Sequence, residues 1–328
     1  MKKLTWIVLV ALLATPAWSA VKPNALISDN AVLQRGISVP IWGTANDGEK
    51  VTVKFLNQVA SATAGKDGKW MVRLKPLKVG GPYMMTISGE NTIEIKNILV
   101  GEVWVCSGQS NMEWPLAQTE TGKDAIGASK DPQVRLLTVP KATPDSPITE
   151  IQASWVECGP GTVDGFSAVG YFFGRDLRKN LNVPIGLINT SWGGTPIETW
   201  TSPAALPSDT GLDAFVKTLP DQPSFKPYKL YNGMIAPLLP YAIRGAIWYQ
   251  GETNAGQGYL YRHRMPGMIR CWREAWGQGD FTFLMVQLAP YLKDNPEPNG
   301  SSWAELRESQ LVTSLTCPKT GMAVITDL

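Results

Sequence analysis

The first hydrophobic pattern in the chain is a series of short apolar stretches between residues 21 and 97. Five of them have the length and alternation of β-strands: Ser38 to Trp42, Val51 to Phe55, Trp70 to Leu74, Tyr83 to Ser88 and Thr92 to Ile95. Turn sequences separate them, including two Asp-Gly pairs and one Gly-Gly-Pro. This spacing predicts a small all-β sandwich over residues 21–97. We expect it to pack against the rest of the chain rather than to hold a glycan.

From residue 98 onward, strand-like and helix-like patterns alternate. Buried strands are predicted near 98–105, 133–139, 184–189, 243–249, 281–288 and 322–325, and helices near 166–177, 260–276 and 302–314. Pro266 falls inside the second helix and predicts a kink or a restart there. Alternation of this kind predicts a parallel sheet with helices on both faces. Ligands bind such sheets at the carboxyl ends of the strands, so the loops that follow them carry the candidate chemistry.

The N-terminus has the pattern of a secretory signal peptide over residues 1–19. Two lysines precede an apolar run over 4–13, and Ala17 and Ser19 provide small residues before the expected cleavage site. The run is shorter than the roughly 20 residues that a membrane-spanning helix needs. We therefore expect a periplasmic or secreted protein with no membrane partner.

Composition narrows the possible partners. The 30 basic and 28 acidic residues nearly balance, with no long run of like charge, so nothing indicates a nucleic-acid partner. The 13 tryptophans are more typical of core and rim aromatics than of sugar-stacking platforms alone. The four cysteines lack the spacing of a metal site, and either two disulfides, in any of three pairings, or free buried thiols are compatible with the sequence.

Three loops after predicted strands carry candidate chemistry. The first, Gly-Gln-Ser-Asn-Met at 108–112, places Ser110 where a turn enters a helix, an arrangement that exposes a hydroxyl and aims backbone N–H groups at one point. The second contains Gly193 and Gly194, which permit close backbone approach to a ligand. The third places the Gln250 side-chain amide at the sheet edge. Taken singly, a helix-capping serine, a tight turn and a loop amide are ordinary features.

Taken together and in this order, the three segments resemble the bacterial sialate O-acetylesterase family of SGNH-type carbohydrate esterases. The matching segments are Gly-Gln-Ser-Asn-Met (108–112), Trp-Gly-Gly-Thr-Pro-Ile-Glu (192–198) and Tyr-Gln-Gly-Glu (249–252). Two N-terminal segments, 29–35 and 40–43, and the segment 303–310 are similar to the family as well. The resemblance extends over nearly all of residues 24–328.

The resemblance implies a fold and a set of roles. The fold is a three-layer α/β/α SGNH-type hydrolase with a flavodoxin-like parallel sheet, over residues 98–328. Ser110 corresponds to the nucleophile, and its own N–H, an N–H of Gly193 or Gly194, and the Gln250 amide correspond to the oxyanion hole. Glu252 has a positioning role. Tryptophans that could line a sugar pocket are Trp114, Trp192 and Trp200. No metal or cofactor is implied, and the substrate is an O-acetylated sugar; the oligomeric state stays open.

The chain departs from the family in its catalytic base. A serine needs a base, usually a histidine oriented by a carboxylate, and the family supplies both from an Asp-Ile-His-type motif after its last core strand. That motif is absent, and we expect the esterase domain to lack its C-terminal end. The only histidine, His263, lies between two arginines and is predicted to be a surface residue. Activity of the chain as given is therefore expected to be low.

Several functions remain open at this stage. O-acetylated sialic acid is the leading substrate, and an acetyl-xylan or other sugar O-acetylesterase is a close alternative. A non-catalytic glycan-binding protein and a serine peptidase are alternatives from other classes.

Overall fold

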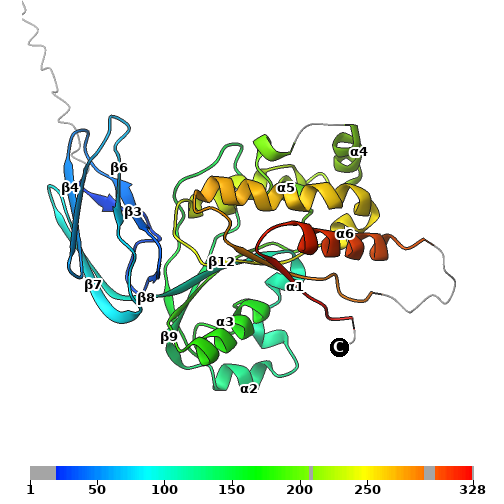
Figure 1. The fold of residues 1–328 in the computed structure, drawn as a ribbon, viewed down its shortest axis with the longest axis horizontal. Coiled ribbons are helices and arrows are strands. Elements are labelled where there is room, and N and C mark those ends of the chain that lie inside the picture. The colour runs from blue at the N-terminus through cyan, green and yellow to red at the C-terminus, as the bar shows by residue number, and fades with distance from the viewer. Residues whose placement is uncertain (1–19, 207–209, 292–299, 327–328) are drawn as a thin grey trace, which may run out of the picture.

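The computed structural model describes residues 20–206, 210–291 and 300–326. The predicted signal peptide, residues 1–19, lies outside these ranges. Within them the chain forms a small β-sandwich that continues into an α/β part (Figure 1). None of the described helices combines the length and apolar character that crossing a bilayer requires.

The N-terminal part is a two-sheet sandwich, as the alternating pattern predicts. One sheet is antiparallel and consists of β1 (Lys22–Pro23), β3 (Val39–Thr44) and β6 (Lys69–Leu74). The other contains β2 (Val32–Gln34), β4 (Lys50–Phe55), β5 (Gln58–Thr63), β7 (Gly80–Ser88) and the start of β8 (Thr92–Gly108). Alternate side chains of β4 and β6 are buried between the sheets. Sequence patterning missed β5, which pairs only with β4 and has no fully buried residue.

The predicted domain boundary at residue 97 falls inside a continuous strand. β8 is 17 residues long; its first part pairs antiparallel with β7, and its second part joins the parallel sheet. Its residues from Ile98 to Gly108 are all buried. The two parts of the molecule therefore share one strand rather than a flexible linker.

The sheet of the α/β part is parallel apart from one edge. Its order is β10 (Val156–Cys158), β9 (Asp131–Thr138), β11 (Ile185–Ser191), β8, β12 (Gly245–Tyr249), β13 (Thr282–Val286) and β14 (Thr320–Ala323), with only β10 antiparallel. Every residue of β11 and β12 is buried, as expected for central strands covered on both faces. The chain crosses from one side of β8 to the other between β11 and β12, so β8 lies at the topological switch point.

Helices cover both faces of this sheet (Figure 1). The described α-helices are α1 (Ser110–Glu113), α2 (Gly122–Gly127), α3 (Ala168–Leu181), α4 (Thr210–Thr218), α5 (Gly258–Trp276) and α6 (Ser302–Thr316). Along β8, Val103 and Val105 share a core with Trp272 of α5, whereas Trp104 shares the opposite core with Tyr171 of α3. Of the kink or restart predicted at Pro266, the restart does not occur: α5 runs through the proline as one helix, and buried side chains on both sides hold it against the sheet.

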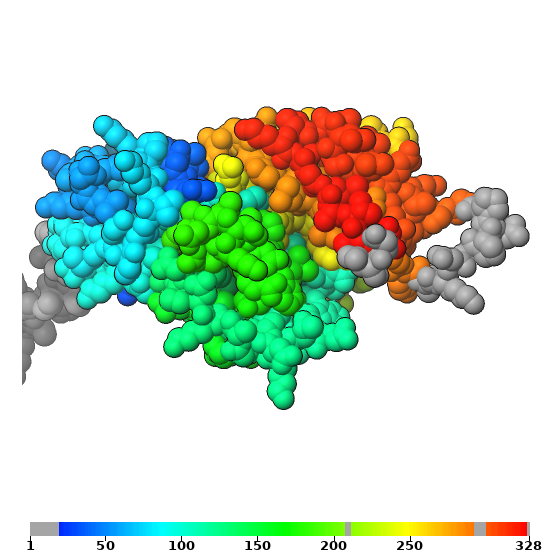
Figure 2. All heavy atoms as spheres, turned by 60° about the horizontal axis from the view of Figure 1, so that its bottom comes forward, coloured from blue at the N-terminus to red at the C-terminus, as the bar shows by residue number. Residues whose placement is uncertain are grey.

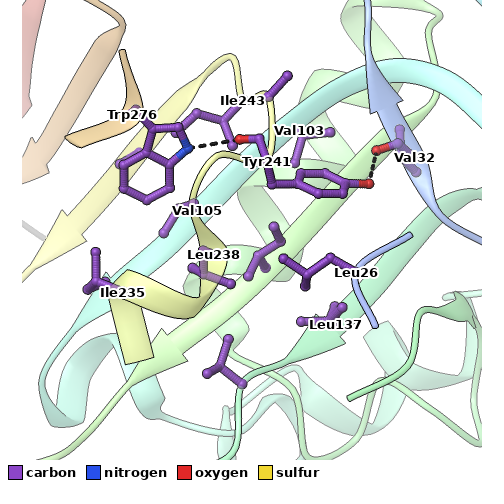
Figure 3. Close-up of a cluster of buried hydrophobic side chains, with 14 of the residues drawn as sticks. Leu26, Val32, Val103, Val105, Leu137, Ile235, Leu238, Tyr241, Ile243 and Trp276 are labelled. Carbon is purple, nitrogen blue, oxygen red and sulfur yellow. Dashed lines mark hydrogen bonds between the residues drawn. The ribbon is translucent and has the colours of Figure 1, made fainter. Parts of the chain in front are cut away.

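The sandwich packs against the α/β part through a shared hydrophobic core, as the sequence predicts. The Tyr241 hydroxyl donates a 2.7 Å hydrogen bond to the carbonyl of Val32 in β2, and Trp276 donates a 2.8 Å bond to the carbonyl of Tyr241 (Figure 3). Leu26 of the N-terminal part lies in the same cluster. In the space-filling view the two parts adjoin directly (Figure 2).

All four cysteines are free, so the disulfide alternative does not hold in this structure. Cys106, Cys158 and Cys271 are buried. Burial raises the pKa of each of these thiols, which makes them poor nucleophiles.

Candidate active site

The three predicted loops meet at the carboxyl edge of the central strands. β8 lies between β11 and β12, and their last residues are in register: Ser191 pairs with Gly108, and Gly108 pairs with Tyr249. The loops that follow these three strands therefore emerge side by side. The sheet brings together segments that are far apart in the sequence.

The turn before Ser110 is built around Gly108. Its φ of +139° and its contact with β12 both require glycine, because a Cβ there would lie 2.1 Å from the carbonyl oxygen of Tyr249. The N–H of Gln109 donates to that same carbonyl at 2.9 Å. Helix α1 then begins at Ser110, which is exposed and whose N–H belongs to the first turn, where no helical carbonyl accepts.

Gly193, not Gly194, faces the serine. A Cβ added to Gly193 would lie 3.3 Å from the Cβ of Ser110, whereas a Cβ on Gly194 would meet Phe225 first, at 3.6 Å. Gly194 has a φ of +77°, so it provides the left-handed turn while Gly193 provides the close approach. The structure thus distinguishes two glycines that the sequence left equivalent.

The Gly193 N–H is already engaged by a carboxylate. It donates a 2.6 Å hydrogen bond to Oε2 of Glu113, the last residue of α1. Oε1 of Glu113 forms an ion pair with Lys141, whose ammonium lies 5.0 Å from the centre of the Trp192 ring. Sequence reasoning missed Glu113 and Lys141. The available signal for Glu113 was its position three residues after Ser110, which places both on one side of a helical turn.

The predicted oxyanion role of Gln250 does not match its contacts. The side chain is fully buried, and its Nε2 donates to the carbonyl of Thr195 at 3.1 Å and to Oδ1 of Asn254 at 2.7 Å. Its Oε1 accepts from the Tyr261 hydroxyl at 2.9 Å. Both amide hydrogens are therefore used inside the protein, as full burial demands, and neither is offered to an anion at Ser110 in this arrangement.

Glu252 lies beside the nucleophile loop, as predicted. Its Oε1 accepts a 2.6 Å hydrogen bond from Asn111, the residue after Ser110. Its Oε2 is buried and has no hydrogen-bond partner among the described residues. Burial raises the pKa of Glu252, and the bond from Asn111 only partly opposes this effect.

A buried polar network lies behind the second and third loops. Glu198, the last residue of the Trp-Gly-Gly-Thr-Pro-Ile-Glu segment, forms an ion pair with Arg264 of α5 and accepts two hydrogen bonds from Asn254. Burial raises the pKa of Glu198, while Arg264 and Asn254 favour its ionised form. Asn254 also accepts from the N–H of Ile197, so it ties the third loop to the second.

A cavity of about 530 Å³ opens beside Ser110. Trp114 lines it and is 48% exposed, and its place in a sugar pocket stays a prediction. Trp192 is half-buried and stacks under Lys141, another residue of the cavity wall. The prediction for Trp200 is wrong: it is fully buried and donates to Thr195, because its ring fills the core behind the loop.

His263 is a surface residue, as predicted. It is exposed on α5, with its ring edge-on to that of Tyr259 at 5.7 Å. It is not among the residues that line the cavity beside Ser110. Among the described residues, none is hydrogen-bonded to the Ser110 hydroxyl, so no candidate base contacts it in this part of the chain.

Comparison with known proteins gives consistent matches. The family model for carbohydrate esterases described as sialic acid-specific acetylesterase matches residues 100–326. Human sialate O-acetylesterase is 33% identical over 340 residues, and the rat protein is 32% identical over 362 residues. A crystal structure of a carbohydrate acetylesterase from Xanthomonas citri shares 41% identity at a TM-score of 0.87, covering 94% of this chain and 69% of that one. The alignment with the human enzyme covers 92% of this chain and 64% of the relative's length.

Proposed function

This chain belongs to the carbohydrate esterase family of sialic acid-specific acetylesterases, and we propose that it hydrolyses O-acetyl esters on sugars with Ser110 as nucleophile. The observation that carries the proposal is the convergence of Ser110 and the Gly193 N–H at the switch point of the sheet. Acyl transfer requires an exposed hydroxyl beside backbone N–H donors, and here the Gly193 N–H is held by the Glu113 carboxylate, which a substrate must displace. The parallel sheet, with helices on both faces, supports assignment to the three-layer SGNH type.

The reaction proceeds through two acyl transfers. The Ser110 oxygen bonds to the acetyl carbon while its proton passes to a base, and the carbonyl electron pair moves onto oxygen. The N–H groups of Ser110 and Gly193 stabilise that oxyanion. The bond to the sugar oxygen then breaks, the sugar oxygen takes up a proton, and the acetyl group stays on Ser110 until water releases it as acetate.

Glu252 and Gln250 act through other residues in this proposal. Glu252 holds Asn111 and so orients the turn that presents Ser110. Gln250 joins the second and third loops through Thr195 and Asn254. We assign the base to no residue of the printed sequence, because its single histidine is exposed on α5 and does not line the cavity.

O-acetylated sialic acid is the first substrate to test, followed by acetylated xylan and other neutral acetylated sugars. Relatives named sialate O-acetylesterase support O-acetylated sialic acid as the substrate. The similar structure from Xanthomonas citri is described only as a carbohydrate acetylesterase, which supports testing other acetylated sugars as well. A glycan-binding protein without catalysis is the second candidate. The observation in its favour is the Ser110 hydroxyl without a base among the described residues.

The test is acetate release by the chain and by Ser110→Ala, each with and without added imidazole as a free base. We expect slow release that depends on Ser110 and rises with imidazole, because the oxyanion donors alone support a residual rate. The rate of acetate release in the Ser110→Ala sample with imidazole measures the hydrolysis that imidazole catalyses without the serine. Equal rates in the two proteins under all conditions, with retained sugar binding, would favour the glycan-binding alternative.

Export to the periplasm or the medium is part of the same proposal. The basic, apolar and small-residue succession over residues 1–19 supports it. Expression in a Gram-negative host followed by N-terminal sequencing tests it. A mature chain that begins at Ala20 is the expected result, and an uncleaved cytoplasmic product would contradict it.

A further inference from the structure

The Glu113 carboxylate occupies two positive positions in the candidate site at once. Oε2 accepts from the Gly193 N–H at 2.6 Å, and Oε1 pairs with the Lys141 ammonium. In the proposed reaction, the first of these positions must bind the oxyanion. The Glu113 carboxylate is therefore an anion of the protein itself, held where a substrate anion has to bind.

Lys141 is suited to bind an external anion. Its side chain is 44% exposed and that of Glu113 is 33% exposed, so their pair is in contact with solvent. Exposed ion pairs contribute only about 0–1 kcal/mol, so replacing Glu113 by another carboxylate as the partner of Lys141 costs little free energy. Stacking over Trp192 keeps the ammonium at the wall of the cavity even when its partner changes.

The charges around the cavity favour a ligand with its own carboxylate. Among the described residues that line it, Lys141 is the single cation and Glu113 the single carboxylate. If Glu113 is displaced, Lys141 remains without a partner close to Ser110. A neutral sugar would leave that ammonium unpaired, whereas an acidic sugar supplies the replacement.

We propose that Lys141 recognises the carboxylate of an acidic O-acetylated sugar. Until substrate binds, the Glu113 carboxylate occupies the positions that the substrate carboxylate and the oxyanion take in the complex. The two contacts of Glu113 then correspond to two oxygen groups of one substrate. The inference rests on the proposed function of Ser110, and it makes Lys141 the residue that separates acidic from neutral sugars at this site.

Calorimetric binding tests the proposal without any need for turnover. The ligands are N-acetylneuraminic acid and its methyl ester, which lacks the negative charge and adds one methyl group. We expect the unaltered protein to bind the acid roughly 5- to 20-fold more tightly than the ester, the range expected of one charge-assisted contact at a partly exposed site. Lys141→Met should lower the affinity for the acid to that for the ester and leave the ester unchanged. Glu113→Gln should strengthen binding of the acid, because it removes the competing charge.

Lys69→Met is the matched control. Lys69 also pairs with a carboxylate, that of Asp67, but lies in β6 of the sandwich, so its loss should leave both affinities unchanged. Circular dichroism and thermal unfolding of each variant establish that it is folded. Equal affinity for acid and ester in the unaltered protein, or equal loss of both in Lys141→Met, would overturn the inference.

Failure of the inference is distinguishable from failure of the proposed function. Acetate release from 4-nitrophenyl acetate, a neutral ester, reports Ser110 chemistry without a substrate carboxylate. Ser110-dependent release without preference for the acid refutes only the role of Lys141. A preference for the acid that Lys141→Met abolishes, together with release that is independent of Ser110, refutes only the hydrolysis.

Discussion

Asn111 donates a 2.6 Å hydrogen bond to Glu252, although the two residues are 141 positions apart in the chain. The bond joins the loop that carries Ser110 to the loop after β12. Gln109 makes a second link, since its Oε1 accepts from the N–H of Gly251 at 3.3 Å. The residues on either side of Ser110 are thus both held by the third loop, which constrains the turn that carries the serine.

Glu252→Gln should change how stability depends on pH. The pKa of Glu252 is raised by burial, so the folded chain holds this proton more tightly than the unfolded chain. The resulting stabilisation is fully present below about pH 4.5, the ordinary value, and is lost as pH rises through the raised pKa. Guanidinium unfolding between pH 4 and 8 should show a smaller decline in the variant, by about 1.4 kcal/mol for each unit of pKa difference. Parallel curves for the two proteins would contradict the assignment.

Gly193→Ala should lower activity far more than it lowers stability. The new Cβ would lie 3.3 Å from Ser110 and 3.2 Å from Glu113, so the N–H must shift away from the oxyanion position. We expect a fall in kcat of about tenfold to a hundredfold, below the effect of removing an oxyanion donor altogether. Acetate release in the presence of imidazole measures it.

Gly194→Ala is the control for this change. Its φ of +77° predicts a loss of about 1 kcal/mol in stability, but the nearest atom to its Cβ is in Phe225, not in Ser110. A larger loss of activity in Gly194→Ala than in Gly193→Ala would indicate that Gly194, not Gly193, provides the oxyanion N–H.

Arg264→Met should be strongly destabilising. The side chains of Arg264 and Glu198 are 7% and 1% exposed, and removing the cation leaves a buried carboxylate without its partner. Guanidinium unfolding should show a loss of about 3–5 kcal/mol, partly recovered in the double variant with Glu198→Gln. Arg262→Met, also in α5, breaks the partly exposed pair with Glu308 of α6 and should cost about 1 kcal/mol or less. Equal effects of the two arginine variants would contradict this account.

Tyr241→Phe tests the contact between the sandwich and the α/β part. The variant keeps the ring in the shared core but leaves the carbonyl of Val32 without its hydroxyl donor. We expect a loss of about 1–2 kcal/mol in the free energy of unfolding, with a single cooperative transition retained. Tyr259→Phe, at a residue 72% exposed, should have no measurable effect. An unchanged stability of Tyr241→Phe would mean that the bond contributes nothing net.

The sequence by itself predicted most of the longer strands and helices, and the three loops that carry the candidate chemistry. Period-two and period-3.6 patterns report burial locally, so the predicted strand Val51 to Phe55 and the helix 302–314 lie within one or two residues of β4 and α6. Exposed Ser110 and surface His263 also followed from local features. The edge strand β5 was missed because it is only half-buried. Local patterning also did not show that the runs on either side of residue 97 form one strand.

Only the tertiary structure decided which groups face the serine. The choice of Gly193, the engagement of Gln250 by Thr195 and the Glu113–Lys141 pair all depend on contacts between separate segments. Trp200 matched a pocket residue in sequence yet lies in the core. The physical reason is that a hydrogen bond forms or fails over a few tenths of an ångström. Distances on that scale between the three loops are set by the order and register of β11, β8 and β12, which no periodicity within a single segment encodes.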